Sequence, residues 1–518
     1  MLERVKLHKF LRFISSRFFI TALLILLQAC WLVVLFSDVV GNSVLFSTLF
    51  KLLSIVMVLY IIGKVDVPGY KIGWIILIML FPLLGGLLYL LLGENRPAKY
   101  LRKRIEVGNA KHDLYMAQDP DTLDTLRETA PRLACCASYI SNYGCFPVWG
   151  DSSVKYHSLG DYQYPDMLEM LRKAEKFIFL EYFIIEEGEM WNTIRDILAE
   201  KAAQGVDVRL IYDDVGCLVH IPANYYRGLE KRGIKCLVFN PFIPIISGVM
   251  NNRDHRKIMI IDGKTAFTGG INLSDEYINR RVRFGKWKDS GVMVQGKAVW
   301  SFTVMFLELW NAFNENDADF TDYLCSEEPE GETHGFVQPF SDSPLDSETV
   351  SSNVYLDILA QAKDYVYIFT PYLAISDEMS IALMAAAKRG VDVRMVLPGI
   401  PDKPLAYQLS RSYYGPLLKA GVRIFEYSPG FLHAKSYVSD DEVAVVGTIN
   451  MDYRSLYLHF ECGVMMYGCP AVADLRRDAE ETIAVSHEVH AGEDHKSKFG
   501  KLFGAFSDSI LRLFAPLF

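Results

Sequence analysis

Three long apolar stretches dominate the N-terminal part of the chain. Residues 18–36 carry no charge, residues 44–62 carry only Lys51, and residues 72–92 are again uncharged. A run of about 20 apolar residues is what an α-helix needs to cross a bilayer. The pattern predicts an N-terminal α-helical transmembrane segment within residues 1–95. A cleaved signal peptide is the alternative for the first stretch, but no small-residue cleavage site followed by a polar chain is present.

Beyond residue 150 the pattern changes to short strand-like runs that alternate with helical ones. Residues 176–185 and 364–373 are aromatic and β-branched, and each run follows an amphipathic stretch. Each precedes a helix and then one of two similar phrases, GVDVRLIYDD at 205–214 and GVDVRMVLPG at 390–399. Alternating strands and helices predict an α/β fold, and the internal repeat predicts two lobes of it.

Composition suggests where these parts begin and end. We expect membrane-anchoring helices at 1–95, a helical connector at 96–150, one lobe at 151–320, an acidic linker at 321–349, a second lobe at 350–490 and an amphipathic tail at 491–518. The linker rests on residues 314–350, which hold eleven acidic and no basic residues. The tail has apolar residues at helical spacing, which fits either packing on the core or a helix on a lipid surface.

One gapped phrase occurs in each predicted lobe. The two copies are His255-x-Lys257, Asp262, Gly269-Gly270 and Asn272 in the first lobe, and His433-x-Lys435, Asp440, Gly447-Thr448 and Asn450 in the second. In both copies Asp lies five positions after Lys, the first Gly seven positions after Asp, and Asn three positions after that Gly. Chance does not easily place so long a pattern twice in one chain, so we expect both copies to serve one site.

The residue types in this phrase suit a phosphodiester. Residues two apart on a strand lie on one face, so the imidazole and the ammonium group can meet the same anion. One neutral imidazole can attack phosphorus, while the other, protonated, gives a proton to the leaving oxygen. The lysines, with Asn272 and Asn450, would bind the non-bridging oxygens.

The candidate catalytic residues are therefore His255, Lys257, Asp262, His433, Lys435 and Asp440. The two aspartates lie too far along the strand to act directly with the lysines. We expect them to be structural or to belong to the hydrogen-bond frame of the site.

The doubled phrase is the signature of the phospholipase D superfamily, and residues 253–277, 285–299 and 410–461 closely resemble bacterial cardiolipin synthases. The resemblance implies two mixed-sheet lobes flanked by helices and related by a pseudo-twofold, with both motifs facing one site. It further implies that Asp289 and Glu461 orient the histidines, supported by Gly270 and Thr448. The sequence leaves open which carboxylate serves which histidine.

The same resemblance implies a cardiolipin synthase, which transfers a phosphatidyl group between two phosphatidylglycerol molecules through a phosphatidyl-histidine. We expect His255 to be the nucleophile, as in the first motif of relatives. Hydrolysis of phospholipid or nucleic acid, transfer to a different alcohol and a non-enzymatic scaffold are the alternatives. We expect membrane lipid as the partner and no nucleic acid, because a nuclease hardly needs so long an apolar anchor. No cofactor or metal is expected, since neither step of the transfer requires one.

Composition argues against two other kinds of site. The nine cysteines include no CxxC pair, so they predict neither a disulfide framework nor a zinc site. Three histidines gather at 487–495, but no second pattern completes a metal site, and a polar hinge is expected. The net charge of −9 conceals a basic stretch at 251–288, with nine basic residues against four acids, which would attract anionic lipid.

The charges that flank the apolar stretches predict a multi-pass protein of the cell membrane. Basic residues precede the first stretch, and five more lie at 96–104. The positive-inside rule places both flanks in the cytoplasm, which requires an even number of crossings. Three stretches give an odd number. Either one does not cross, with Lys51 or the Pro82-x-x-Gly85-Gly86 phrase as the reason, or the lobes face outward; we favour the cytoplasmic side.

Overall fold

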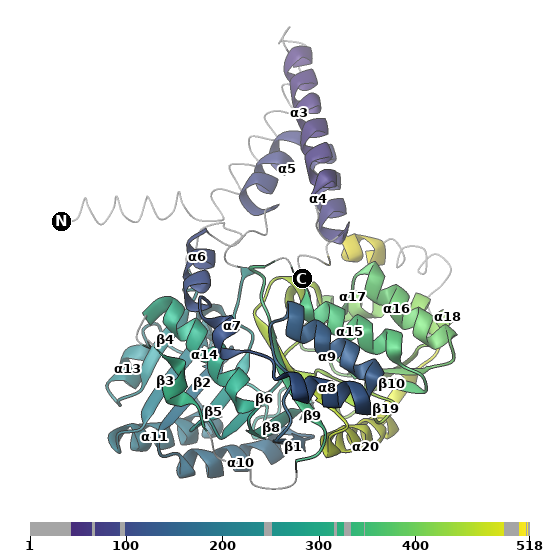
Figure 1. Cartoon of the computed structure of the whole chain (residues 1–518). Helices are drawn as coiled ribbons and strands as arrows, with labels where there is room; N and C mark the ends of the chain where they lie inside the picture. The colour runs from purple at the N-terminus through teal and green to yellow at the C-terminus, as the bar shows by residue number, and fades with distance from the viewer. Residues whose placement is uncertain are drawn as a thin grey trace, which may run out of the picture.

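The computed structural model describes residues 43–64, 68–93, 99–242, 251–314, 317, 319–325, 333–346, 348–491, 507–513 and 515. Two α/β lobes lie side by side, and the N-terminal helices project from one end of them (Figure 1). The first apolar stretch, at 18–36, and His495 lie outside the described residues.

The N-terminal helices differ from the expected long spans. Helix α3 covers Ser43–Gly63, but the stretch at 72–92 is divided among α4 (Pro68–Leu80), α5 (Pro82–Leu88) and a π-helix (Tyr89–Gly93). The break falls at Phe81 because Pro82 has no backbone N–H and starts a new helix. None of the helices among the described residues is both long and apolar enough to cross a membrane.

Four helices occupy the predicted connector. They are α6 (Lys99–Gly108), α7 (His112–Tyr115), α8 (Pro120–Thr129) and α9 (Pro131–Tyr143). Helices α8 and α9 each begin with a proline, and the Asp119 side chain caps α8 by accepting from the backbone N–H of Thr122. Helix α6 packs on the first lobe and α9 on the second, so the connector contacts both lobes.

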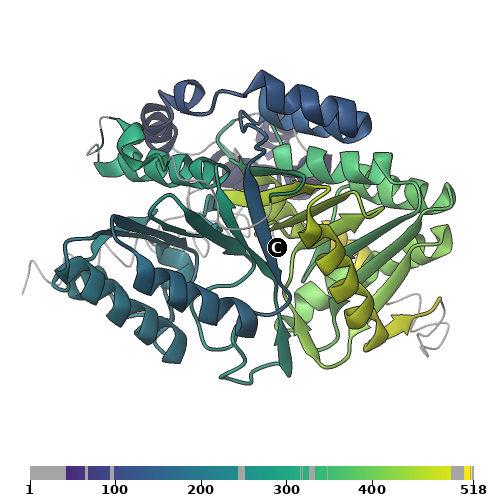
Figure 2. The ribbon, with the colours of Figure 1, turned by 60° about the horizontal axis from the view of Figure 1, so that its bottom comes forward.

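The first lobe is a seven-stranded mixed sheet with the order β1-β8-β6-β5-β2-β3-β4. Its strands are β1 (Ser152–His157), β2 (Phe177–Tyr182), β3 (Asp207–Asp213), β4 (Lys235–Phe239), β5 (Lys257–Ile261), β6 (Thr265–Gly269) and β8 (Gly291–Gly296). Every residue of β2 is buried, because helices cover both faces of the sheet. Helices α10 (Gly160–Lys173) and α11 (Glu189–Ala203) lie on one face and α14 (Val299–Asn314) on the other (Figure 2).

The second lobe repeats this strand order with one strand added at the edge, giving β19-β13-β12-β10-β15-β16-β18-β9. Its strands are β9 (Phe336–Asp342), β10 (Tyr365–Phe369), β12 (Asp392–Pro398), β13 (Arg423–Tyr427), β15 (Ser436–Ser439), β16 (Val443–Gly447), β18 (Glu461–Tyr467) and β19 (Ser486–Val489). Helices α15 (Val350–Gln361), α16 (Asp377–Lys388) and α18 (Tyr414–Ala420) pack together, and α20 (Pro470–Ala484) packs on the sheet from the other side (Figure 2). The two α/β lobes expected from the repeat are therefore present.

One segment differs from the boundaries expected from composition, and the described part of the tail follows one of its two alternatives. Strand β9 lies inside the range 321–349 that we expected to be a linker, and it pairs with β18 at the edge of the second sheet. An edge strand tolerates Pro339, which had suggested a linker. In the tail, residues 507–513 form a helix, and Arg512 stacks on Tyr413 with 4.6 Å from its guanidinium carbon to the ring centre. This described part of the tail therefore packs against the second lobe.

Short strands join the lobes near the predicted motifs. Strand β7 (Lys286–Lys288) of the first lobe pairs in parallel with β14 (Gly430–Leu432) of the second. A single β-bridge joins Asp254 to Phe460. The backbones of the two lobes are therefore hydrogen-bonded to each other immediately before each of the two histidines.

Candidate active site

Both predicted motifs open on one cavity of about 680 Å³ between the lobes. Strands β5 and β15 lie at corresponding central positions of the two sheets, and each motif histidine lies just before its strand. The motif residues that line the cavity are His255, Asn272, His433 and Asn450. The structure thus brings the two copies of the phrase to one place.

The backbone of each histidine is held by the opposite lobe. The amide of His255 donates to the carbonyl of Phe460 at 2.9 Å, and that of His433 donates to the carbonyl of Lys288 at 2.7 Å. Phe460 and Lys288 each precede a predicted supporting carboxylate, Glu461 or Asp289. These two backbone contacts place each carboxylate against the histidine of the other lobe.

The carboxylates pair with the histidines across the lobes. His255 Nδ1 lies 2.9 and 3.0 Å from the two oxygens of Glu461, and His433 Nδ1 lies 2.6 Å from Asp289 Oδ2. A carboxylate at Nδ1 favours the tautomer with its proton there and leaves Nε2 for the substrate. The pairing that the sequence left open is therefore crossed.

The two carboxylates are held in place in different ways. Thr448 Oγ1 and Ser455 Oγ each donate to Glu461 at 2.5 Å. At the matching place in the first lobe, Gly270 leaves room for the other carboxylate, because a Cβ there would lie 2.1 Å from Asp289 Oδ1. The second position of the pair is therefore Gly270 in the first phrase, where Asp289 leaves no room for a Cβ. It is Thr448 in the second phrase, where the hydroxyl donates to Glu461.

Burial controls the protonation of the histidines. Loss of hydration lowers the pKa of His255 to about 3, although Glu461 opposes the shift. Burial, with the charges of Lys435 and Lys257, lowers the pKa of His433 well below its usual value. Burial acts the other way on Glu461, but the His255 ring keeps the pKa of this carboxyl below its ordinary value. A neutral His255 that donates to an ionised Glu461 has a free lone pair on Nε2, as a nucleophile requires.

The two motif lysines are fully buried beside the histidines. Lys257 Nζ donates to the carbonyl of His255 at 2.5 Å, and Lys435 Nζ contacts both the carbonyl and Nδ1 of His433. Burial lowers the pKa of Lys257 to about 8 and that of Lys435 to about 7. Burial also raises the pKa of Asp289 to about 7. An arriving phosphate anion would stabilise the charged form of both lysines.

The two asparagines have different surroundings. Asn272 accepts from the backbone of Ile184 at 3.0 Å and donates to the hydroxyl of Tyr277 at 2.7 Å, so protein groups engage both ends of its amide. The amide oxygen of Asn450 is buried without a hydrogen-bond partner among the described residues. Both asparagines face the cavity, where we expected a phosphate to bind.

The two motif aspartates lie away from the cavity, at the far end of each motif strand. Asp262 accepts from the backbone N–H groups of residues 175–177 at 2.7–2.9 Å, and Asp440 accepts in the same way from residues 363–365 at 2.9 Å. Both have φ of 54°, a left-handed conformation that aspartate tolerates. Each aspartate thus holds the start of β2 or β10 against the turn that follows the motif strand. We had named both among the candidate catalytic residues, and the structure corrects this: their role is structural.

Replacing Asp262 by Ala should lower the free energy of unfolding by roughly 2–3 kcal/mol, because three backbone N–H groups lose a charged acceptor. Urea unfolding of purified protein measures this loss. The exposed Asp474, which pairs with neighbouring Arg477, supplies the control Asp474→Ala. An Asp262→Ala protein of unchanged stability but without activity would return Asp262 to the catalytic residues.

Two ring residues beside the histidines were not predicted from the sequence. The ring centre of Trp287 lies 5.5 Å from that of His433, and the ring centre of His459 lies 5.6 Å from that of His255. Both stand two residues before a supporting carboxylate, which is the signal that could have identified them. The first lobe therefore presents an indole where the second presents an imidazole.

His459 also belongs to a cluster that could hold a metal ion. Ligand atoms of His255, His459 and Glu461 all lie within 4.8 Å of one another. Both oxygens of Glu461 already accept hydrogen bonds, from the hydroxyls of Thr448 and Ser455 and from His255. A metal would have to displace these donors, so the donor set fits a histidine-orienting carboxylate better than a metal ligand.

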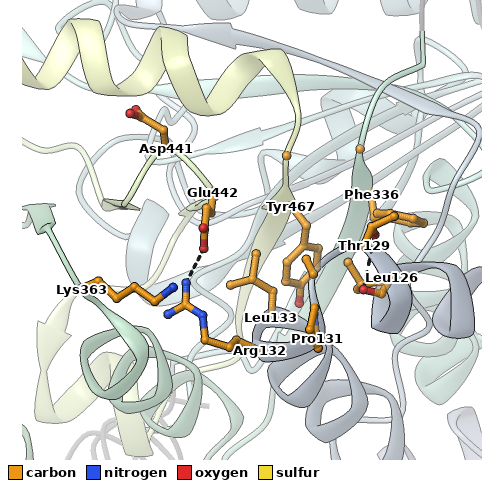
Figure 3. A pocket seen from close by; sticks show the side chains of 13 residues that line it. Leu126, Thr129, Pro131, Arg132, Leu133, Phe336, Lys363, Asp441, Glu442 and Tyr467 are labelled. Carbon is orange, nitrogen blue, oxygen red and sulfur yellow. Dashed lines mark hydrogen bonds and ion pairs between the residues drawn. The ribbon is translucent and has the colours of Figure 1, made fainter.

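A second cavity of about 640 Å³ lies away from the histidines, where α8 and α9 meet the second lobe. Arg132 Nη2 pairs with Glu442 at 2.6 Å on its wall, and Lys363 lies close by (Figure 3). Neither motif histidine is among the residues that line it. It therefore offers neither the nucleophile nor the acid that the cavity between the lobes provides.

Known proteins resemble the chain along most of its length. A sequence model described as "Cardiolipin synthase, PLD-like domain" matches residues 167–307 and 355–483, and one described as "Phospholipase_D-nuclease N-terminal" matches 52–94. A Streptococcus mutans chain described as "Uncharacterized protein" is 46% identical over 89% of this chain and 99% of its own length. Cardiolipin synthase 2 of Bacillus anthracis is 32% identical, covering 87% of each chain. Cardiolipin synthase of Geobacillus kaustophilus is 33% identical, covering 91% of this chain and 94% of its own.

Among solved structures, phosphatidylserine synthase of Haemophilus influenzae aligns with 74% of this chain and 98% of its own, with a TM-score of 0.56 and 15% identity. At that identity the likeness concerns the fold alone. It agrees with the two mixed-sheet lobes described above.

Proposed function

The chain belongs to the cardiolipin synthase family of the phospholipase D superfamily, and on that premise we propose that it forms cardiolipin and glycerol from two molecules of phosphatidylglycerol. The observation that carries this proposal is the pair of histidines on one cavity, each oriented by a carboxylate of the opposite lobe. Such a pair supplies both a nucleophile and a proton donor for exchange at a phosphodiester.

In the first step, Nε2 of His255 attacks the phosphorus of one phosphatidylglycerol. A phosphorus–nitrogen bond forms as the phosphorus–oxygen bond to the headgroup glycerol breaks. The glycerol oxygen takes a proton from His433, whose protonated form is favoured once an anionic phosphodiester binds beside it. Lys257, Lys435 and Asn450 would bind the non-bridging oxygens, where negative charge increases in the transition state.

In the second step, the free hydroxyl of another phosphatidylglycerol attacks the phosphatidyl-histidine. The phosphorus–nitrogen bond breaks, a phosphorus–oxygen bond forms, and His433 takes the proton of the attacking hydroxyl. One phosphodiester replaces another, so the exchange needs no nucleotide. His255 is then again neutral and free of the phosphatidyl group, and His433 is again protonated.

A pseudo-twofold axis between the lobes would account for the matched features of the site. The amide of each histidine donates to a backbone carbonyl of the opposite lobe, and the ring of each contacts a carboxylate of that lobe. Asp262 and Asp440 occupy equivalent turns with the same φ. The roles still differ, because the lobes surround their histidines with different rings.

We also propose that the N-terminal helices hold the protein at the cell membrane, where its substrates reside, and that the protein is multi-pass. Helix α3 exposes large apolar side chains along its length, including Leu49, Leu59 and Ile62. Water disfavours such surfaces, whereas lipid solvates them.

Feeding pure phosphatidylglycerol in mixed micelles to the purified protein tests the proposed function. Cardiolipin and glycerol in equal amounts, resolved by mass spectrometry, are the expected products. Phosphatidic acid without cardiolipin would make the protein a hydrolase. A new phosphatidyl ester, formed only when another alcohol is supplied, would mean a different acceptor.

The pH dependence of the reaction should show an alkaline loss. The pKa values of Lys435 and Lys257, about 7 and 8, mean that both lysines lose their charge as the pH rises past this range. Phosphate binding needs the charged form of both lysines, so kcat/KM should decline by up to about tenfold per pH unit between about pH 7 and 8 and by up to about a hundredfold per unit above about pH 8. Initial rates from pH 6 to 10 measure this quantity for the free enzyme. A flat profile up to pH 10 would contradict the assignment.

A further inference from the structure

Four further Arg or Lys side chains line the cavity, and the exchange at phosphorus does not use two of them, Arg283 and Lys403. Arg283 comes from the first lobe and Lys403 from the second, and both line the cavity that contains the histidines. Lys403 immediately precedes α17 (Pro404–Ser412), and Arg283 lies shortly before β7. The proposed function leaves both residues without a role.

The two loops that carry these side chains touch each other beside His433. A Cβ on Gly285 would lie 3.1 Å from Ile400 Cδ1, and the amide of Ile400 donates to the carbonyl of Gly430 at 3.2 Å. Gly430 opens β14, which ends directly before His433. The charge of Lys403 is one cause of the low pKa of His433. Both residues thus lie at the His433 end of the cavity.

Neither charge is closely neutralised by its neighbouring carboxylate. Lys403 Nζ lies 3.9 Å from Asp402 Oδ2, and that oxygen already accepts a 2.6 Å hydrogen bond from the hydroxyl of Tyr372. Arg283 Nη1 lies 3.7 Å from Glu276. The side chains are 68% and 53% exposed, so an anion in the cavity can approach both.

The second step of the proposed reaction requires an anion near this end. The acceptor phosphatidylglycerol brings its hydroxyl to His433, which takes the proton. Its own phosphate is attached to the other end of the same glycerol unit. Water and free glycerol, the competing acceptors, carry no such phosphate.

We propose that Lys403 and Arg283 form a second anion site, which binds the phosphate of the acceptor phosphatidylglycerol and so selects an anionic lipid alcohol over water or glycerol. The inference rests on the proposed function and on His433 as the residue that takes the acceptor's proton. The acceptor hydroxyl replaces His255 at phosphorus as already described, while the acceptor's own phosphate stays intact and serves only as the binding group.

Two reactions that share the first step isolate this site. Purified full-length protein in mixed micelles receives phosphatidylglycerol together with isotope-labelled glycerol. Cardiolipin formation reports the phosphate-bearing acceptor, and label entering phosphatidylglycerol reports the acceptor without a phosphate. The ratio of the two rates cancels any change in attack by His255 or in the fraction of folded protein.

The double variant Lys403→Gln/Arg283→Gln should lower this ratio about 10- to 100-fold, the effect of losing charge-assisted contacts to a phosphate. The single variant Lys403→Arg keeps both positive charges, so it should retain most of the ratio that the unaltered protein shows. The matched control is Lys388→Gln, an exposed lysine at the end of α16, which should leave both rates unchanged.

An unchanged ratio in the double variant, whether both rates fall together or neither falls, would overturn the second anion site. Unaltered protein that exchanges labelled glycerol but makes no cardiolipin would instead contradict the proposed function. The two failures are therefore distinguishable in one experiment.

Discussion

Replacing His255 by Ala should abolish cardiolipin formation, with kcat reduced at least about 10⁴-fold, and His433→Ala should do the same. The first variant lacks the nucleophile, and the second lacks the group that moves the proton, so neither can complete the cycle. Both side chains border a cavity and are 7% and 8% exposed. Truncation therefore enlarges an existing space, and thermal unfolding should show that both variants remain folded.

An activated substrate separates the two roles. A phosphatidyl ester of p-nitrophenol has a leaving group that needs no proton, so the first step can proceed without His433. His433→Ala should then release about one equivalent of p-nitrophenol per enzyme and retain the phosphatidyl group on His255, which peptide mass spectrometry can locate.

His255→Ala should give no such burst. The control is His334→Ala, an exposed residue outside both lobes' motifs, which should keep full turnover. A burst from His255→Ala with the adduct on His433 would exchange the two roles.

Much of the fold could be predicted from the sequence because its signals are local. The aromatic runs that became β2 and β10 are bounded by helical stretches of recognisable period. The repeat then gives the second lobe from the first. The doubled phrase places His255 and His433 at matching points of the two lobes. One site shared by both histidines could therefore be predicted if the lobes pack face to face.

Features that depend on contacts distant in sequence could not be predicted in the same way. Composition alone made residues 321–349 a linker, but β9 gains its place by pairing with β18, more than a hundred residues later.

The crossing of the carboxylates is the clearest case of this limit. Asp289 is nearer in sequence to His255, and Glu461 is nearer to His433. Only the bridge between Asp254 and Phe460, and the pairing of β7 with β14, decide that each serves the opposite lobe.

Replacing either carboxylate by the matching amide should reduce turnover about 10²- to 10⁴-fold. The carboxylate holds the imidazole with its proton at Nδ1, and an uncharged amide does not fix this tautomer. The variants are Glu461→Gln and Asp289→Asn, which keep the size of the side chain. The double variant His255→Ala/Glu461→Gln should be no slower than His255→Ala alone, since both changes disable one unit.

The activated phosphatidyl ester turns the crossed pairing into a qualitative difference between these variants. Glu461→Gln should lose the burst of p-nitrophenol, because Glu461 orients His255, the attacking residue. Asp289→Asn should keep the burst and turn over slowly afterwards, because Asp289 serves His433, which acts on the acceptor. If each carboxylate served the histidine of its own lobe, the two results would be reversed. Because both variants are measured as folded protein against the same substrate, the order of the two burst amplitudes decides which carboxylate serves the attacking histidine.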